Sequence, residues 1–387
     1  MQQIYLDNNA TTQPLPEVIE AMTGAMTVSF GNASSGHSRG DLARKALEHA
    51  RINVSRLIGA PDDSVIFTSG ATEANNLAIL SCLPTDPSQG RIVTTTVEHS
   101  SILKLCDQLE AHGVEIVRIA VDSNGLVDLE RLEASLIPET DVLSVQWVNN
   151  ETGVVQPVGE IAAIADAKGV ALHVDAAQAI GKLETRVAGL PIDYMSVTAH
   201  KIHGPQGVGA LYVRPGRTLR PILRGGPQES GRRAGTENLP GIVGFGRAAE
   251  LRAGRMQQIA EHVGALRDMF ERALVGALTD IRINAAAAPR VAGSTNILFF
   301  GVDGQALVAR LDQAGIYCSQ SSACTNQRPE PSYVLRAMGL SEEEAYAGVR
   351  FSFSEMNTVA EVQSAAEIVI QTVRALRAFD GAGAFAA

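Results

Sequence analysis

The chain has 387 residues, 45% of them hydrophobic and 19% charged, which is enough for two or three domains with a large core. This composition excludes a disordered chain and a small disulfide-stapled module. The formal net charge of -10 argues against a dedicated polyanion binder, so no direct contact with nucleic acid is expected. There is no apolar run of about 18 residues and no signal-like start, so we expect a cytoplasmic protein without a membrane span.

Short β-branched runs alternate with helical patterns between about residues 60 and 215. The expected strands are residues 65–68, 92–95, 114–117, 142–145, 171–174, 194–197 and 210–213. Amphipathic segments lie between them, among them residues 72–83, 100–112 and 158–168, and Gly113 and Gly169 follow the last two as expected helix ends. This order predicts an α/β fold with a mostly parallel seven-stranded sheet covered by helices.

The pattern changes after Glu237, where one long helical stretch is expected up to about Leu278. Shorter strands and helices then alternate, at residues 296–300, 304–314, 316–318, 331–338, 349–353 and 358–378. They predict a second, smaller α+β domain. We assign residues 15–255 to the large domain, and residues 1–14 and 256–387 to the small one.

Two polar motifs stand where predicted strands end, the place where α/β sheets bind ligands. The turn after residues 65–68 opens a helix at Ala71 and Thr72, whose free N–H groups suit a phosphate. The same turn is also an ordinary helix cap. Asp175 follows the strand at residues 171–174 and is either a ligand-binding acid or a helix cap.

Lys201 follows the strand at residues 194–197, in the run Thr-Ala-His-Lys-Ile-His-Gly-Pro. It is a candidate Schiff-base amine, because burial would lower its pKa and leave the amine nucleophilic. His200 and His203 have H-x-x-H spacing, but no Cys or carboxylate lies at a ligand-like offset. We therefore expect no metal site.

The four cysteines contain no C-x-x-C pair, so we expect reduced thiols. Cys82 and Cys106 fall within amphipathic segments and Cys318 ends a strand, so all three are expected to be packing residues. Cys324 instead lies in a polar loop of small residues, where a thiol can be exposed and ionise.

Taken together and in this order, these motifs resemble the pyridoxal-phosphate-dependent cysteine desulfurases of the nitrogen-fixation and iron–sulfur-cluster assembly type. These enzymes are class-V aminotransferases of fold-type I. The resemblance runs nearly end to end, through residues 5–12, 31–34, 68–76, 98–99, 148–153, 173–178, 200–201, 231–238, 322–325, 330–332 and 349–352.

The resemblance implies a cofactor site. Lys201 would hold pyridoxal 5'-phosphate as a Schiff base and move the substrate Cα proton, while Asp175 would pair with the pyridine nitrogen. His99 would stack on the ring and donate a proton, and Gln178 and Asn150 would hydrogen-bond the phenolic oxygen. The residues implied to hold the phosphate are Ala71, Thr72, Thr198, His200 and Thr236.

The resemblance also implies the substrate and the partners. Arg350, aided by Asn32, would clamp the carboxylate of L-cysteine. Cys324 would take the substrate sulfur as a persulfide, which leaves L-alanine, and pass it to an acceptor protein such as a cluster scaffold or relay. Thr236 would reach the cofactor of the neighbouring subunit, so a homodimer is implied.

Parts of the sequence are also compatible with three other functions. Residues 36–40 match the G-x-S-x-G motif of serine hydrolases, but no strand leads into them as that motif requires. A non-catalytic sulfur-relay subunit would have no chemical reason to keep all of the catalytic residues above. A pyridoxal-phosphate lyase or aminotransferase acting on selenocysteine or cysteine sulfinate is the remaining alternative, although Cys324 favours desulfuration.

The loop around Cys324 departs from the family pattern, with Ser321 where glycine is common and Pro329 where proline is unusual. Both residues restrict backbone conformations, so we expect a stiffer loop and slower sulfur transfer. Turnover should therefore rise in Ser321→Gly and Pro329→Leu variants assayed at saturating acceptor. Unchanged rates in both variants would contradict this expectation.

Overall fold

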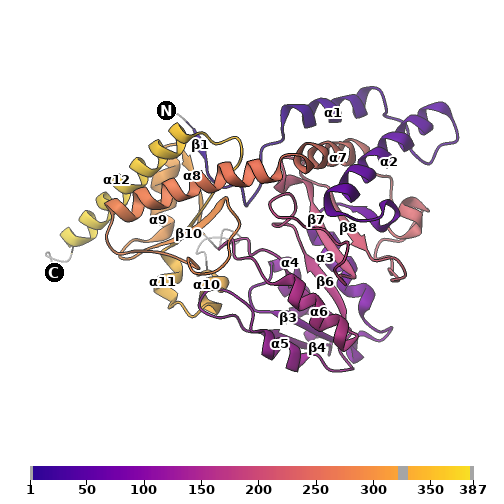
Figure 1. Cartoon of the computed structure of the whole chain (residues 1–387), viewed down its shortest axis with the longest axis horizontal. Helices are drawn as coiled ribbons and strands as arrows, with labels where there is room; N and C mark the ends of the chain where they lie inside the picture. Colours follow the sequence, from indigo (N-terminus) through magenta and orange to yellow (C-terminus); the bar gives the residue numbers. More distant parts are fainter. Residues whose placement is uncertain (1–2, 321–329, 384–387) are drawn as a thin grey trace.

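The computed structural model describes residues 3–320 and 330–383, and its larger sheet has seven strands in the order β2-β8-β7-β6-β5-β3-β4 (Figure 1). The strands are β2 (Val65–Thr68), β3 (Arg91–Thr95), β4 (Glu115–Ile119), β5 (Val142–Gln146), β6 (Ala171–Asp175), β7 (Tyr194–Thr198) and β8 (Gly209–Val213). β8 runs antiparallel to both of its neighbours, and every other pair in the sheet is parallel. The predicted mostly parallel sheet is confirmed.

Helices cover both faces of this sheet because its strands are apolar on both sides. In β2, for example, Val65 and Phe67 face one core while Ile66 faces the other. The first face is covered by α1 (Pro16–Thr27), α2 (Ser38–Ile58), α5 (Leu129–Ser135), α6 (Val158–Lys168) and α7 (Leu239–Ala253). The second face is covered by α3 (Ala71–Cys82) and α4 (Ser100–Glu110).

A second core surrounds a four-stranded antiparallel sheet at the other end of the molecule (Figure 1). Its strands are β9 (Ile281–Ile283), β10 (Ser294–Phe299), β12 (Ser319–Gln320) and β13 (Gly348–Ser352). Its helices are α8 (Met256–Ala277), α9 (Gly304–Gln313) and α12 (Val359–Gly383). Two further helices, α10 (Tyr333–Ala337) and α11 (Glu342–Tyr346), pack in a separate small cluster with Leu298 of β10. The first strand, β1 (Ile4–Tyr5), pairs with β11 (Ile316–Tyr317), so both ends of the chain contribute to this core.

The seven large-sheet strands agree with the sequence prediction to within two residues. The single long helix expected up to about Leu278 is wrong, because α7 and α8 are separate helices broken at Gly254 and Arg255. Glycine weakens a helix, and Arg255 has a non-helical φ of -129°. Arg252 and Arg255 both form ion pairs with Glu355, at 3.1 and 3.0 Å, which hold the break in place.

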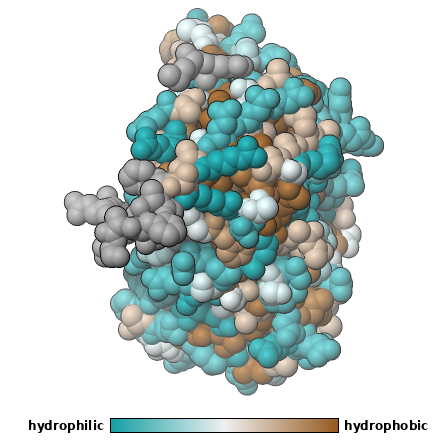
Figure 2. Space-filling view, turned by 90° about the vertical axis from the view of Figure 1, so that its left-hand side faces the viewer, coloured by the Kyte–Doolittle hydropathy of each residue, from teal (hydrophilic) through white to brown (hydrophobic). Residues whose placement is uncertain are grey.

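No helix in the described ranges is long and apolar enough to cross a membrane. α12, the longest of the described helices, carries Glu361, Glu367, Arg374 and Arg377 among its apolar residues. Figure 2 shows the end of the molecule formed by the second core, where polar and apolar side chains are intermixed on the surface.

We expect Phe270→Ala to lower the free energy of unfolding by about 3–5 kcal/mol. The Phe270 ring is fully buried, and its centroid lies 4.9 Å from that of Phe351 and 5.5 Å from that of Phe353. Val275→Ala on the same helix is the control, because Val275 is 57% exposed and its loss should cost under about 0.5 kcal/mol. Urea denaturation compares the two; an equal loss for both variants would contradict the assignment of Phe270 to the core.

Candidate functional site

The predicted cofactor residues lie along one edge of the large sheet, at the carboxyl ends of β2, β3, β5, β6 and β7. β2 points the same way as the parallel strands because β8, its partner, is itself antiparallel to β7. Ligands of open α/β sheets bind at this edge. The structure brings to it Ala71, Thr72, His99, Asn150, Asp175, Gln178, Thr198, His200 and Lys201.

Asp175 ends β6, and hydrogen bonds fix its carboxylate. The Asn75 amide donates to Oδ2 at 2.8 Å, and the Ala177 N–H donates to Oδ1 at 2.9 Å. Asn75 also donates to Ser101 Oγ at 2.9 Å, while its buried Oδ1 has no hydrogen-bond partner among the described residues. These bonds fix a carboxylate at the carboxyl edge of the sheet, where it is suited to pair with a cationic ring nitrogen.

The turn between β2 and α3 offers backbone N–H groups to an anion. α3 begins at Ala71, and its N-cap, Gly70, has no side chain to satisfy them. A Cβ on Gly209 of the adjacent β8 would lie 2.7 Å from Gly70 Cα, so glycine is required for this close approach. The uncapped start of a 12-residue helix, with Thr72 exposed in its first turn, is a good phosphate site.

Lys201 ends a short 3-10 turn (Ala199–Lys201) that follows β7. Its Nζ donates to the main-chain oxygens of Asn9 at 2.6 Å and Ala10 at 2.8 Å. Burial, and next the Arg350 cation, lower the pKa of Lys201 to about 8, although two nearby carboxylates oppose this. A sizeable fraction of the amine is therefore neutral and nucleophilic near neutral pH.

Two histidines flank Lys201 and Asp175. His99 is the N-cap of α4, where its Nδ1 accepts from the Ser101 N–H at 3.2 Å, and desolvation lowers its pKa. Desolvation also lowers the pKa of His200, to about 4. Both rings are therefore neutral at pH 7. Because His99 Nδ1 accepts a hydrogen bond, its ring proton lies on Nε2, which can act as a donor.

Thr198 ends β7, directly before the turn that carries His200 and Lys201. Its hydroxyl donates to the main-chain oxygen of Val208 at 3.2 Å. His200 Nδ1 lies 3.2 Å from Thr11 Oγ1, so the N-terminal segment contacts this turn as well.

Gln178 and Asn150 both form hydrogen bonds with Asn9: Gln178 contacts its main chain and Asn150 contacts its side chain. Gln178 Nε2 donates to Asn9 O at 2.8 Å, and Asn9 Nδ2 donates to Asn150 O at 3.3 Å. The buried Asn150 Oδ1 has no hydrogen-bond partner in the described part of the chain. A buried, unsatisfied amide oxygen of this kind indicates a missing polar ligand.

Arg350 reaches the same segment from β13 in the second core. Its Nη2 pairs with Asp7 Oδ1 at 2.7 Å and its Nη1 donates to Asn150 O at 3.0 Å, while Nε has no described partner. The guanidinium is thereby fixed in direction beside Lys201, whose pKa it lowers. A fixed guanidinium is suited to a carboxylate.

Three predicted site residues are not part of this group. Asn32, between α1 and α2, is exposed, and its Oδ1 accepts from its own loop, the Ser34 N–H, at 2.8 Å. Thr236 is also exposed and lines a separate pocket of about 160 Å³ with Thr68 and Ser69. Cys324, like Ser321 and Pro329, lies outside the described residues.

The other three cysteines are free thiols. Burial raises the pKa of Cys82 and of Cys106 to about 12, and it raises that of Cys318 as well. Raised thiol pKa values leave little thiolate, so these three are poor nucleophiles, as expected for packing residues.

Four residues of the site were assigned no role by sequence reasoning: Asp7, Asn9, Asn75 and Lys182. The sequence contains only weak signs that three of these residues belong to the site. Asp7 and Asn9 lie in the family motif at residues 5–12, and Lys182 stands four residues after Gln178. In residues 3–320 and 330–383, no group of three or more His, Cys, Asp or Glu side chains is arranged to hold a metal ion.

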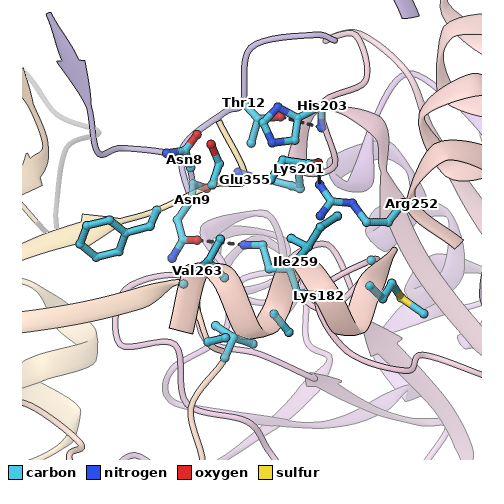
Figure 3. Close-up of a pocket in the computed structure, with 18 residues that line it drawn as sticks. Asn8, Asn9, Thr12, Lys182, Lys201, His203, Arg252, Ile259, Val263 and Glu355 are labelled. Atoms are coloured by element: carbon cyan, nitrogen blue, oxygen red, sulfur yellow. Dashed lines mark hydrogen bonds and ion pairs between the residues drawn. The ribbon is translucent and has the colours of Figure 1, made fainter. Parts of the chain in front are cut away.

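A small cavity of about 40 Å³ lies beside Lys201 and is lined by residues of both cores (Figure 3). Lys182 and Lys201 line it on one side, and Ile259 and Val263 of α8 line it on the other. It has room for about three water molecules and is too small for a substrate.

The residues present fit pyridoxal phosphate. The uncapped start of α3 suits its phosphate, and the Asp175 carboxylate suits its ring nitrogen. Lys201 suits its aldehyde, and the buried Asn150 Oδ1 and Asn75 Oδ1 are left without a hydrogen-bond partner among the described residues.

Comparison with known proteins gives the family. Residues 4–364 match the Aminotransferase class-V family. A cysteine desulfurase of Bradyrhizobium diazoefficiens is 47% identical over 97% of this chain and 95% of its own length. A cysteine desulfurase of Cereibacter sphaeroides is 45% identical over 99% of both chains.

Solved structures agree with this result. A NifS-like protein has a TM-score of 0.90 and 34% identity over 97% of this chain and 100% of its own. A structure described as SspA in complex with cysteine has a TM-score of 0.81 and 32% identity over 92% of this chain and 100% of its own.

The chain therefore belongs to the class-V aminotransferase family, and within it to the cysteine desulfurases. It has the fold-type I architecture and is a pyridoxal-phosphate-dependent enzyme. The resemblance inferred from the sequence motifs is confirmed. The serine hydrolase alternative fails on geometry too, because Ser38 begins α2 after a loop rather than after a strand.

We expect the rate at which the apoprotein takes up pyridoxal phosphate to rise with pH through a midpoint at about 8, because the neutral Lys201 amine is the reacting form. Arg350 lowers the pKa of Lys201, so in Arg350→Met the midpoint should move to higher pH. Arg310→Met, at an exposed position on α9, is the control and should keep the midpoint. Stopped-flow absorbance measures the rates; identical midpoints in all three proteins would contradict the prediction.

Proposed function

We propose that the protein is a cysteine desulfurase that converts L-cysteine to L-alanine and places the sulfur on Cys324 as a persulfide. One observation carries the proposal: the Lys201 amine and the Arg350 guanidinium, from different cores, both bind the segment formed by residues 7–10. An α-amino acid has a carboxylate next to its reacting carbon, so this pair suits it. The relative SspA, described in complex with cysteine, supports the choice of substrate.

Pyridoxal phosphate, when bound, supplies an aldehyde carbon and a ring that withdraws electrons from the substrate Cα. Asp175 would favour a protonated ring nitrogen, and Gln178 and Asn150 would contact the phenolic oxygen. Lys201 would take and return the Cα proton, because its lowered pKa allows both at neutral pH. The phosphate would be held by Ala71, Thr72, Thr198, His200 and Thr236.

The sulfur step would use Cys324 as a thiolate. Its sulfur attacks the substrate sulfur, so that an S–S bond forms while the substrate Cβ–S bond breaks. The electron pair of the broken bond stays on Cβ, which takes a proton and becomes the methyl group of alanine. The thiol is oxidised as the carbon is reduced, so no external oxidant is needed.

The protein would act as a homodimer in the cytoplasm and pass the sulfur to an acceptor protein, such as one serving iron–sulfur cluster assembly. Two features support the dimer: Thr236 and Asn32 are exposed in the single chain, and neither lines the cavity beside Lys201. Three free thiols suit a reducing compartment.

We expect Cys324→Ala to abolish sulfide release from L-cysteine in the presence of a reductant, while the yellow absorbance of the bound cofactor is kept. Cys318→Ala is the matched control and should keep most of the activity, because burial raises the pKa of that thiol. Sulfide and alanine are measured together.

Sulfide release undiminished in Cys324→Ala would replace the persulfide route with a lyase reaction, of the kind considered for selenocysteine or cysteine sulfinate. A purified wild-type protein without the cofactor absorbance would contradict the assignment of the cofactor residues.

A further inference from the structure

Lys182 contacts the centre of the site without a role in the functions described above. Its Nζ donates to Gln178 Oε1 at 2.7 Å and to Asn9 Oδ1 at 2.9 Å (Figure 3 shows the contact with Asn9). Both of these described partners are uncharged amide oxygens. An ammonium group next to the cofactor pocket, held by amides instead of a carboxylate, is costly to stability and calls for a functional explanation.

The surroundings of Lys182 make this cost larger. Burial, followed by the cations of Lys201, Arg252 and Arg350, lowers the pKa of Lys182 well below its usual range. Two of these cations have acidic partners, since Arg252 pairs with Glu355 and Arg350 pairs with Asp7. The remaining titratable groups near Lys182 and Lys201 are Asp175, His99, His200 and His203.

The contacts of Lys182 determine which way two amides point. A lysine amine has at least two N–H donors in either protonation state, and those of Lys182 are directed at the two amide oxygens. Gln178 Nε2 is then turned to Asn9 O, at 2.8 Å, and its second N–H stays available to the cofactor pocket. Asn9 Nδ2 is likewise turned to Ser294 Oγ at 2.6 Å and to Asn150 O at 3.3 Å.

Asn9 O is also the acceptor that holds Lys201 Nζ, at 2.6 Å. Lys182, Gln178 and Asn9 therefore form a closed ring of hydrogen bonds, and the catalytic amine binds to one member of it. Without Lys182, only the bond to Asn9 O holds the Gln178 amide, so the amide turns over more readily and can present an oxygen to a phenolate oxygen. Two acceptors facing each other repel, so cofactor affinity would fall.

We propose that Lys182 is a positioning residue for the cofactor: it fixes Gln178 as a hydrogen-bond donor to the phenolic oxygen and holds Asn9 in place beneath Lys201. This inference rests on the proposed cofactor role of Gln178 and goes beyond it. It assigns no chemistry to Lys182 itself, which acts only through its two amide partners.

The test measures cofactor affinity, so it does not depend on desulfurase activity. Titration of the apoprotein with pyridoxal phosphate should show a dissociation constant about tenfold higher in Lys182→Met, the loss expected for one hydrogen bond at a charged site. Thermal unfolding of the apoprotein should change little, because the removal of a buried amine offsets the loss of its two hydrogen bonds. Lys45→Met, at an exposed position on α2, should change neither quantity.

A double-mutant cycle with Gln178→Leu shows whether Lys182 affects cofactor binding through Gln178. If Lys182 acts through Gln178, Lys182→Met should raise the dissociation constant less than about twofold in the Gln178→Leu background. The full tenfold loss in that background, or no loss in Lys182→Met alone, would overturn the proposal.

If Lys182→Met does not yield folded protein, Lys182→Gln takes its place. A glutamine keeps a polar group at this position but can present either an oxygen or an amide, so it releases the constraint on Gln178. Weakened cofactor binding in Lys182→Gln supports the proposal, and wild-type affinity overturns it.

Discussion

The position of Lys201 depends on two main-chain carbonyls, those of Asn9 and Ala10, which accept both described hydrogen bonds of its Nζ. Main-chain acceptors leave the amine without a neutralising partner, so desolvation is free to lower its pKa. The same short segment is attached to both cores: Asn8 donates to Ser352 O at 2.8 Å, and the Thr12 N–H donates to His200 O at 2.9 Å. The geometry of the amine is therefore set by how the two cores are joined.

The site is rich in basic groups, although the chain as a whole carries a net negative charge. The protein has a formal net charge of -10, yet Lys182, Lys201, Arg252 and Arg350 gather at the junction of the cores, facing Asp7, Asp175 and Glu355. With the uncapped start of α3, these basic groups suit ligands that carry a phosphate or a carboxylate. Burial raises the pKa of two nearby acids, Glu98 to about 8 and Glu151 to about 7, so their negative charge is reduced at neutral pH.

The strands, and the polar residues that end them, could be predicted from the sequence because both are local patterns. Asp175 and Lys201 each follow an apolar run, and in a parallel sheet such runs end at one edge. Asn9 and Lys182 could not be predicted in the same way, since their roles come from contacts across 173 residues of sequence. The break between α7 and α8 was missed because Gly254 and Arg255 hardly interrupt the apolar spacing, and Glu355, which holds the break, is a hundred residues further along.

The pairing of Arg350 with Asp7 joins residues that are 343 positions apart. The large sheet is complete by Val213, so most of its core can form while the ribosome is still adding the rest of the chain. β1 and the Asp7 side chain must wait for β11 and β13, which are made near the end of synthesis. A nascent chain would thus carry Lys201 on a formed sheet well before Arg350 exists to complete the site. Contacts between residues so far apart in sequence form slowly, so the site would be completed in the same step that completes folding.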